Sequence, residues 1–158
     1  MTSSRSVWKP VLVAFLAAAL VAGLGVSVTD LGPWYQGLNK PPWQPPDWLF
    51  GPAWTLIFAC AALSAATAWV AAQSRADRDW LIILFCLNGV LNVVWSLLFF
   101  RLHWIGWAGL EVVALWFSIL ALILLTRRTS ALAAWLLAPY LAWVGFAGVL
   151  NWAVVRLN

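Results

Sequence analysis

Charged side chains are scarce in this sequence. Asp, Glu, Lys and Arg make up 9% of its 158 residues, whereas 65% are hydrophobic. A soluble domain carries about 25% charged residues. A soluble fold of this length has too little interior to hide so much apolar surface. The composition therefore indicates that the solvent of this protein is lipid.

Cysteine and histidine are also rare. The chain has two cysteines, Cys60 and Cys86, and one histidine, His103. These numbers exclude a disulfide framework and leave no metal-ligand spacing. There is no Ser-His-Asp grouping and no glycine-rich nucleotide loop, and the basic residues are scattered although the net charge is +4. We therefore expect no metal, no obligatory cofactor and no nucleic-acid partner.

Long stretches without charge occupy most of the chain. A helix needs about 20 apolar residues to cross the hydrocarbon core, and in lipid its backbone groups must be satisfied internally. Strand-like alternation is absent. The sequence therefore predicts an all-α integral membrane protein, with one domain over residues 1–158 and a bundle of five transmembrane helices. We expect these helices at about 10–29, 48–74, 80–100, 104–126 and 130–155.

The basic residues indicate an orientation, because cytoplasmic loops carry an excess of Lys and Arg. The bias predicts the N-terminus inside, and the first loop and the C-terminus outside. The residues on the predicted inner side are Arg5, Lys9, Arg75, Arg78, Arg127 and Arg128, and those on the outer side are Lys40, Arg101 and Arg156.

The long connection between the first two predicted helices is rich in proline and tryptophan. It reads "WYQGLNKPPWQPPDWLFGPAW" from Trp34 to Trp54. Proline fixes φ and removes a donor, and it pushes the preceding residue toward extended geometry. The sequence therefore predicts a stiff, non-helical loop, which is suited to act as a lid. Membrane-interface anchoring explains the tryptophans equally well. The residues assigned to the lid are Trp34, Pro41, Pro42, Trp43, Pro45, Pro46 and Trp48.

Aromatic and polar residues recur within the predicted helices at three- and four-residue steps, which places them on shared faces. Polar groups within a membrane span usually face the bundle interior or a cavity. The depths of these residues converge on the half of the bundle nearest the long loop. We therefore predict a pocket there for a large, flat, apolar ligand. The faces are Trp54 and Phe58; Asn88, Asn92, Trp95 and Phe99; Trp107, Glu111 and Ser118; and Tyr140, Trp143, Ala147 and Asn151.

Several of these residues have a simpler interpretation. Asn88 and Asn92 are the kind of residue that hydrogen-bonds between membrane helices. Glu111 is either a lone acid paired to a neighbour or one that reaches water. Pro139 marks either a tolerated kink or a hinge.

Three segments resemble the TspO/MBR family, the tryptophan-rich sensory protein or translocator protein family. They are "WYQGLNKPPWQPPDWLFGPAW", "LNVVWSLLFF" and "PYLAWVGFAGVLN", in the family's order and spacing. The resemblance covers essentially the whole chain. It implies a five-helix membrane bundle, usually dimeric, with a pocket beneath the first loop.

The resemblance also implies ligands and roles. It implies binding of porphyrins, including protoporphyrin IX and haem, with a role in tetrapyrrole transport, sensing or regulation. The alternatives it implies are an enzyme that oxidises or degrades bound porphyrin in light, and a translocator that binds cholesterol-like lipids. Synthetic isoquinoline carboxamides are a further ligand class of the family.

Carried over position by position, the resemblance assigns part of the pocket. Trp54 and Trp143 match the tryptophans linked to porphyrin chemistry, so they are the candidate reactive residues. The family's sterol-recognition stretch has a tyrosine where "VLNWAVVR" has Trp152 and Ala153, and a tyrosine common in the second helix is Phe58 here. The full candidate ligand-binding set is Trp54, Phe58, Asn92, Trp95, Trp107, Glu111, Tyr140, Trp143, Ala147 and Leu150.

Small residues in the first predicted helix form two ridges that would let another helix approach closely. They serve packing either within the bundle or between subunits. The resemblance favours a homodimer, and it favours a bacterial cell membrane over the alternative of an outer membrane. The ridges are Ala14, Ala18 and Ala22, and Ala19 and Gly23.

Overall fold

The computed structural model describes residues 7–158 and is helical, with no strand in that range. Arg5, which the orientation argument uses, lies outside the described residues. The α-helices are α1 (Trp8–Val28), α2 (Pro33–Gly37), α3 (Phe50–Ala71), α4 (Arg75–Ser96), α5 (Ile105–Arg127), α6 (Ala131–Leu136) and α7 (Ala138–Leu157). A 3₁₀ turn at Asp47–Leu49 leads into α3, and a π-helical turn at Leu97–Arg101 extends α4.

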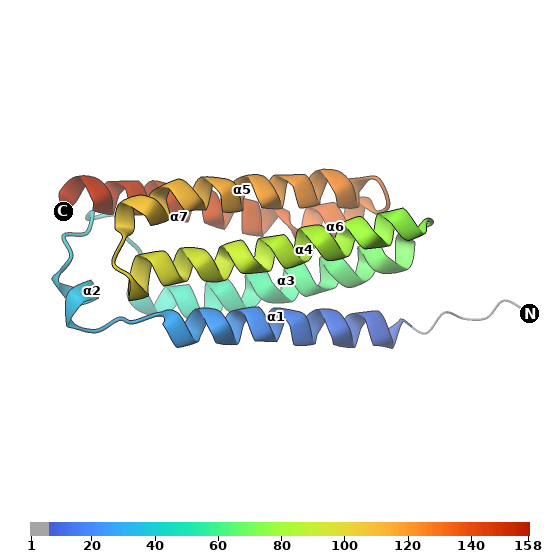
Figure 1. The fold of residues 1–158 in the computed structure, drawn as a ribbon, viewed down its shortest axis with the longest axis horizontal. Coiled ribbons are helices and arrows are strands. Elements are labelled where there is room, and N and C mark those ends of the chain that lie inside the picture. Colours follow the sequence, from blue (N-terminus) through green and yellow to red (C-terminus); the bar gives the residue numbers. More distant parts are fainter. Residues whose placement is uncertain (1–6) are drawn as a thin grey trace, which may run out of the picture.

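Five helical segments are long and apolar enough to cross a membrane. They are Trp8–Val28, Asp47–Ala71, Arg75–Arg101, Ile105–Arg127 and Ala131–Leu157. The prediction of an all-α protein with five spans is therefore confirmed. The helices lie side by side along one long axis (Figure 1).

The helices close into a ring around a shared core. Going around it, α1 packs against α4, α4 against α5, α5 against α6 and α7, α6 against α3, and α3 against α1. The segment around α2 gathers at the end of the bundle where α7 ends, and the α3–α4 connection lies at the opposite end (Figure 1). We call these the loop end and the opposite end.

The opposite end is tight because its side chains are small. Ala68 of α3, Ala72 just after it and Ala133 of α6 are buried against one another. This close approach lets the buried Ser64 hydroxyl donate to the Ala133 carbonyl at 2.7 Å. Near the loop end, by contrast, aromatic side chains lie between α3 and α7.

Two helix boundaries differ from the predicted ones, each for a local reason. The third span begins at Arg75, not near residue 80, because Ser74 and Asp77 form a capping box. The Ser74 hydroxyl accepts from the Asp77 backbone N–H at 3.0 Å, and the Asp77 carboxylate accepts from the Ser74 backbone N–H at 3.2 Å. This arrangement satisfies donors that a helix start leaves free.

The last span is two helices rather than one. It breaks at Leu137, which separates α6 from α7. Pro139 lies in the first turn of α7, where its missing N–H removes no intrahelical bond. Pro139 therefore lies just after a break in the span, and the tolerated kink and the hinge both stay predictions.

The sequence predicts a non-helical connection between the first two spans, but part of this connection is helical. Residues 33–37 form α2, with Pro33 in its first turn. Proline suits that position because its fixed φ is already helical. The segment with the paired prolines, residues 38–46, has no helix.

The two small-residue ridges of α1 face different surroundings. Ala14, Ala18 and Ala22 are half-buried on the side toward the bundle, whereas Ala19 is exposed. A Cβ added at Gly23 would meet nothing within 4 Å. The first ridge therefore serves packing within the bundle, and the second faces outward.

Candidate functional site

Two pairs of aromatic side chains face each other between α3 and α7. Phe50 and Trp54 lie one turn apart on α3, and Tyr140 and Trp143 lie one turn apart on α7. The ring centroids of Phe50 and Trp143 are 5.7 Å apart, and those of Trp54 and Tyr140 are 6.1 Å apart. Phe58 continues the patch by stacking on Trp54 at 5.5 Å. The structure thus brings together four of the predicted site residues.

The indole N–H of Trp143 is a notable feature of this patch. Its Nε1 atom is buried and has no hydrogen-bond partner among residues 7–158. A buried donor without a partner loses its bond to water and gains nothing in return. The Trp143 N–H is therefore available to an acceptor on a bound molecule.

A second group of predicted residues lies under the loop. Trp95, Ala147 and Leu150 line a small cavity together with Phe99 and side chains of the loop. The cavity volume is ≈ 40 Å³, whereas sites for drug-sized ligands measure about 300–1,000 Å³. In this conformation the cavity is therefore much smaller than a site for a drug-sized ligand.

A buried polar network surrounds the Tyr140 hydroxyl. The Tyr140 hydroxyl donates to the side-chain oxygen of Asn88 at 3.1 Å and accepts from the side-chain amide nitrogen of Asn92 at 3.1 Å. The Asn88 amide donates to the Ser118 hydroxyl at 2.8 Å. The expected role of Asn88 and Asn92 as interhelical hydrogen-bonding residues is therefore confirmed, and the network links α4 to α5 and α7.

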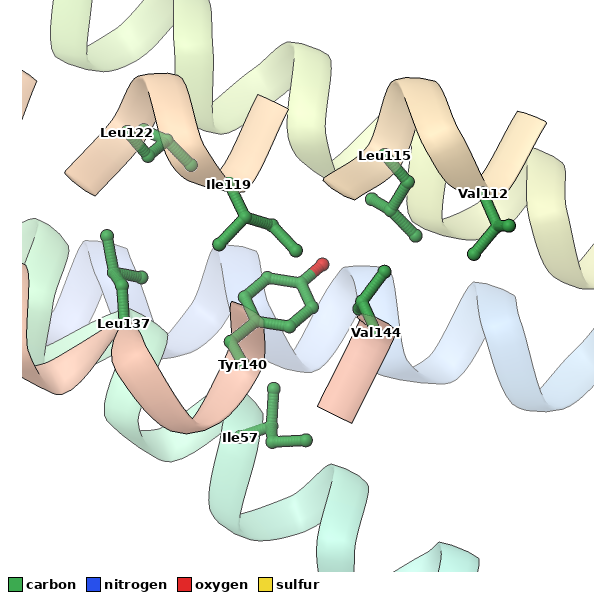
Figure 2. Packing of buried hydrophobic residues seen from close by; sticks show 8 residues of the cluster. All are labelled: Ile57, Val112, Leu115, Ile119, Leu122, Leu137, Tyr140 and Val144. Atoms are coloured by element: carbon green, nitrogen blue, oxygen red, sulfur yellow. The ribbon is translucent and has the colours of Figure 1, made fainter. Parts of the chain in front are cut away.

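The Tyr140 ring lies in an apolar shell. Figure 2 shows the ring between side chains of α5 and α3, with its hydroxyl directed toward the α5 side. Because the ring is enclosed and its hydroxyl has two partners, the side chain has one well-defined position. The shell is Ile57, Val112, Leu115, Ile119, Leu122, Leu137 and Val144.

A second polar contact positions Trp95. Its indole N–H donates to the Asn151 carbonyl oxygen at 3.2 Å, and the Asn151 amide donates to the Ile105 backbone carbonyl at 2.9 Å. Trp95 also stacks on Phe99 at 5.6 Å. Phe99 lies in the π-helical turn, a feature that often occurs at functional sites.

Tyr35 of α2 holds the loop from within. It is buried, and its hydroxyl donates to Asp47 at 3.0 Å. The Gln44 amide donates to the same hydroxyl at 3.3 Å. The Lys40 ammonium lies 3.6 Å from the centroid of the Tyr35 ring, within the range of a cation–π contact. The loop is therefore folded around one aromatic side chain.

The same contacts change the acidity of that phenol. Burial, and after it the hydrogen bond to Asp47 and the charge of Asp47, raise the pKa of Tyr35 to about 12. The neutral phenol is therefore favoured in the docked loop. Its contribution to docking is complete below the ordinary tyrosine pKa of about 10 and is lost as the pH rises through about 12.

Two further contacts fasten the loop to the helices. The Asn158 carboxamide accepts from the Asn39 backbone N–H and donates to the Asn39 carbonyl, both at 3.0 Å. Trp34 stacks on His103 with ring centroids 3.8 Å apart and an interplanar angle of 13°. His103 has a φ of 60°, an uncommon value for a residue with a side chain. The loop is thus held by both α7 and the α4–α5 connection.

The residues assigned to the lid have different surroundings. Pro41 is buried, Trp34 and Pro45 are half-buried, and Pro42 and Pro46 are exposed. Trp43 packs its edge against Phe146 of α7 at 6.0 Å, but Trp48 is 70% exposed. Trp48 thus has the setting of an interfacial anchor rather than of a lid residue.

Two predicted site residues on α5 do not join the aromatic patch. Trp107 is 65% exposed, because the buried stripe at that depth of α5 runs through Ala108 and Val112 instead. Glu111 is half-buried, and neither of its carboxylate oxygens has a hydrogen-bond partner in the described part of the chain. Both oxygens are buried, so within the described residues Glu111 neither pairs with a neighbouring side chain nor reaches water.

Comparison with known proteins gives this arrangement a context. The TspO/MBR family matches residues 11–157. The chain belongs to the TspO/MBR family. It is 35% identical over 156 residues to the tryptophan-rich protein TspO of Chlorobaculum tepidum, covering 95% of this chain and 98% of that protein.

Two other relatives widen the comparison. Protein CrtK of Rhodobacter capsulatus is 33% identical, with 91% of this chain and 90% of that protein covered. The human translocator protein is 31% identical, with 94% of this chain and 85% of that protein covered. With five spans, this TspO/MBR member is an integral, multi-pass membrane protein.

Sequence reasoning missed several residues of the TspO/MBR site. Phe50 and Phe146 lie four residues before Trp54 and three residues after Trp143, so helical spacing could have found them. Tyr35, Lys40 and the Asn39–Asn158 contact carry no such signal, because they are joined across a loop without a period.

The Tyr140 network predicts a measurable loss of stability. Tyr140→Phe removes the one partner that the Asn92 amide nitrogen has among residues 7–158, and it removes the bond to Asn88. We expect the free energy of unfolding to fall by about 1–2 kcal/mol. This range lies between the penalty for leaving a buried polar group unpaired and the smaller contributions measured for hydrogen bonds between membrane helices. Reversible unfolding in mixed micelles would measure it.

The matched control is Thr55→Val, which removes an exposed hydroxyl that bonds only its own helix, to the Gly51 carbonyl. It is expected to unfold like the parent. Equal unfolding of Tyr140→Phe and the parent would mean that the network adds no stability.

Proposed function

We propose that this TspO/MBR protein binds porphyrins, such as protoporphyrin IX and haem, between α3, α7 and the loop, and acts in tetrapyrrole transport, sensing or regulation. The observation that carries the proposal is the facing pair of aromatic patches, with Phe50 against Trp143 and Trp54 against Tyr140. Indole and phenyl faces suit a flat aromatic ligand, because stacked and edge contacts add about 0.5–1.5 kcal/mol each beyond burial.

The chemistry of the patch fits a porphyrin in a second way. The unpartnered Trp143 N–H can donate to a carboxylate on the porphyrin rim, and porphyrins of this kind carry such groups beside a wide apolar ring. A ligand acceptor would therefore satisfy a donor that the protein leaves free. No cofactor is obligatory in this proposal, since the porphyrin is the ligand.

Binding in this place requires the loop to move. The cavity behind it measures ≈ 40 Å³, which is too small for a tetrapyrrole. We therefore propose that residues 29–49 form the cover of the site, docked through Tyr35 and Asn39 and displaced when a ligand enters. Its prolines reduce the conformational freedom that must be lost when the cover closes again.

One alternative belongs to a different class. In it, the protein is an enzyme that oxidises or degrades bound porphyrin in light, with dioxygen as the terminal electron acceptor and with Trp54 and Trp143 as the groups that exchange electrons with the excited ligand. The observation that favours this alternative is that both indoles lie in one aromatic patch with Phe50 and Tyr140. Trp143→Phe separates the alternatives, since it retains an aromatic face and removes the indole.

The proposal extends to other ligands and to location. The human relative is named a translocator protein, and a cholesterol-like lipid or an isoquinoline carboxamide is a further candidate ligand for the same apolar site. We also propose a bacterial cell membrane with the N-terminus inside. In this orientation the loop end, with Lys40, Arg101 and Arg156, faces outward.

Porphyrin binding should depend on the two indoles of the patch. Trp54→Ala and Trp143→Ala are each expected to weaken protoporphyrin IX binding about ten-fold, the loss of one favourable aromatic contact. Quenching of tryptophan fluorescence during titration in detergent or nanodiscs measures this. Trp107→Ala is the matched control, since that indole is exposed on α5, and it should bind like the parent.

The outcomes separate the functions. If both alanine variants are folded and bind as tightly as the parent, the site is misplaced. If the parent converts porphyrin in light and Trp143→Phe binds but does not convert it, the enzyme is favoured. Negligible conversion by the parent in light favours a binder or transporter.

A homodimer is also proposed, through the outward ridge of Ala19 and Gly23 on α1. Small residues let helix backbones approach closely in lipid. Gly23→Leu should lower the dimer fraction in native mass spectrometry, and Gly37→Leu in the loop, equally free of neighbours within 4 Å, should not. A parent that is monomeric at every protein concentration contradicts the proposal.

A further inference from the structure

A second hollow lies on the outer face of the bundle, and no loop residue lines it. It is a groove of ≈ 510 Å³ between α5 and α7. Val113 and Val149 lie on it and are both exposed, at 45% and 62%, so the groove opens to the outside of the bundle. The residues of the aromatic patch do not line it.

Glycines bring the two helices close together along the groove. Gly145 and Gly148 of α7 lie along it. A Cβ at position 145 would come within 3.3 Å of the Trp116 indole nitrogen, and one at position 148 within 3.3 Å of a Val112 methyl. A side chain at either position would require Trp116 or Val112 to shift by a few tenths of an ångström, so the glycines favour this close approach of α5 and α7 beside the groove.

One indole from each helix packs against a glycine of the other helix. Trp116 of α5 lies over Gly145, and Trp152 of α7 lies over Gly109, where a Cβ would be 3.3 Å from the Trp152 ring. Both indoles line the groove. Its walls are thus valine, glycine, alanine and tryptophan, which suit a hydrocarbon chain.

The groove has one charged group, Arg156. Arg156 is exposed and lies in the last turn of α7, at the loop end of the bundle. Gly145 lies eleven residues earlier, which corresponds to about 16 Å along a helix. The groove therefore runs from an interfacial cation down toward the middle of the membrane span.

We propose that this groove binds a glycerophospholipid with an anionic headgroup. One acyl chain lies along Gly145, Gly148 and Val149, and the lipid phosphate pairs with the Arg156 guanidinium. Arginine suits this role because its fork of donors matches phosphate oxygens in a bidentate geometry. A single basic end on an otherwise apolar groove complements a molecule with one anionic end and a long apolar body.

The test is lipid retention by the whole protein. Phosphatidylglycerol and phosphatidylcholine with identical acyl chains are added to the purified protein in detergent, and bound lipid is counted by native mass spectrometry. The parent should retain phosphatidylglycerol preferentially. Arg156→Gln should reduce that preference about five-fold, the factor expected for one basic side chain near an anionic surface. Val149→Trp, which fills the groove, should reduce retention of both lipids.

Two control variants carry the same changes elsewhere. Arg101→Gln removes an exposed cation at the same end of the bundle, outside the groove. Val90→Trp adds the same bulk on the outer face of α4, where Val90 is 59% exposed. Both should retain lipid like the parent. Parent-like unfolding of Arg156→Gln and Val149→Trp in mixed micelles would show that the fold is intact.

Several results would overturn the proposal. One is equal retention of the two lipids by the parent. Another is a loss in Arg101→Gln as large as that in Arg156→Gln, which would mean a general charge effect. A third is unchanged lipid retention in Val149→Trp with conversion of a dimer to a monomer, which would mean that a second copy covers the groove. Displacement of phosphatidylglycerol by cholesterol, equal in the parent and in Arg156→Gln, would assign the groove to a sterol.

Discussion

The Tyr140 hydroxyl, held between two asparagine side chains, is the interaction on which the loop-end half of the bundle depends. In the hydrocarbon core no water can replace a missing partner, so each of these polar groups must find one on another helix. Asn88 and Asn92 lie one turn apart on α4, and both meet the same hydroxyl of α7. This requirement sets the register of α4 against α7 and thereby places Trp95 and Trp143.

The contrast between the two ends of the bundle follows from side-chain size. Alanines draw α3 and α6 together at the opposite end, whereas Phe50, Trp54 and Trp143 keep α3 and α7 apart near the loop. Space opened in this way must be filled in a folded protein. At the loop end, Tyr35 is buried in a cluster with Phe99, Ala108 and Val154, and Trp43 of the loop packs against Phe146 of α7.

The sequence predicts much of this arrangement because helices have a period and membrane spans have a length. The spacing of Asn88, Asn92 and Tyr140 was sufficient to place them in the interior. The same reasoning did not anticipate that Trp107 is 65% exposed, because the buried positions near the start of α5 are Ala108, Gly109 and Val112. The Tyr35–Asp47 and Asn39–Asn158 contacts could not be predicted, because a proline-rich loop has no period and the second pair is 119 residues apart. The start of α4 was missed because a capping box outweighed the charges around it.

The central claim is that a flat ligand enters the site only when the loop leaves it. Asn39→Cys with Asn158→Cys, in a Cys60→Ser, Cys86→Ser background, allows a short reducible thiol cross-linker to join the loop to α7 where the two asparagines already meet. The measurement is protoporphyrin IX affinity before and after reduction of the cross-link. The account predicts that the cross-linked protein loses at least about ten-fold in affinity, equivalent to 1.4 kcal/mol, and that reduction restores it. Equal affinity in the cross-linked and reduced protein would contradict the account.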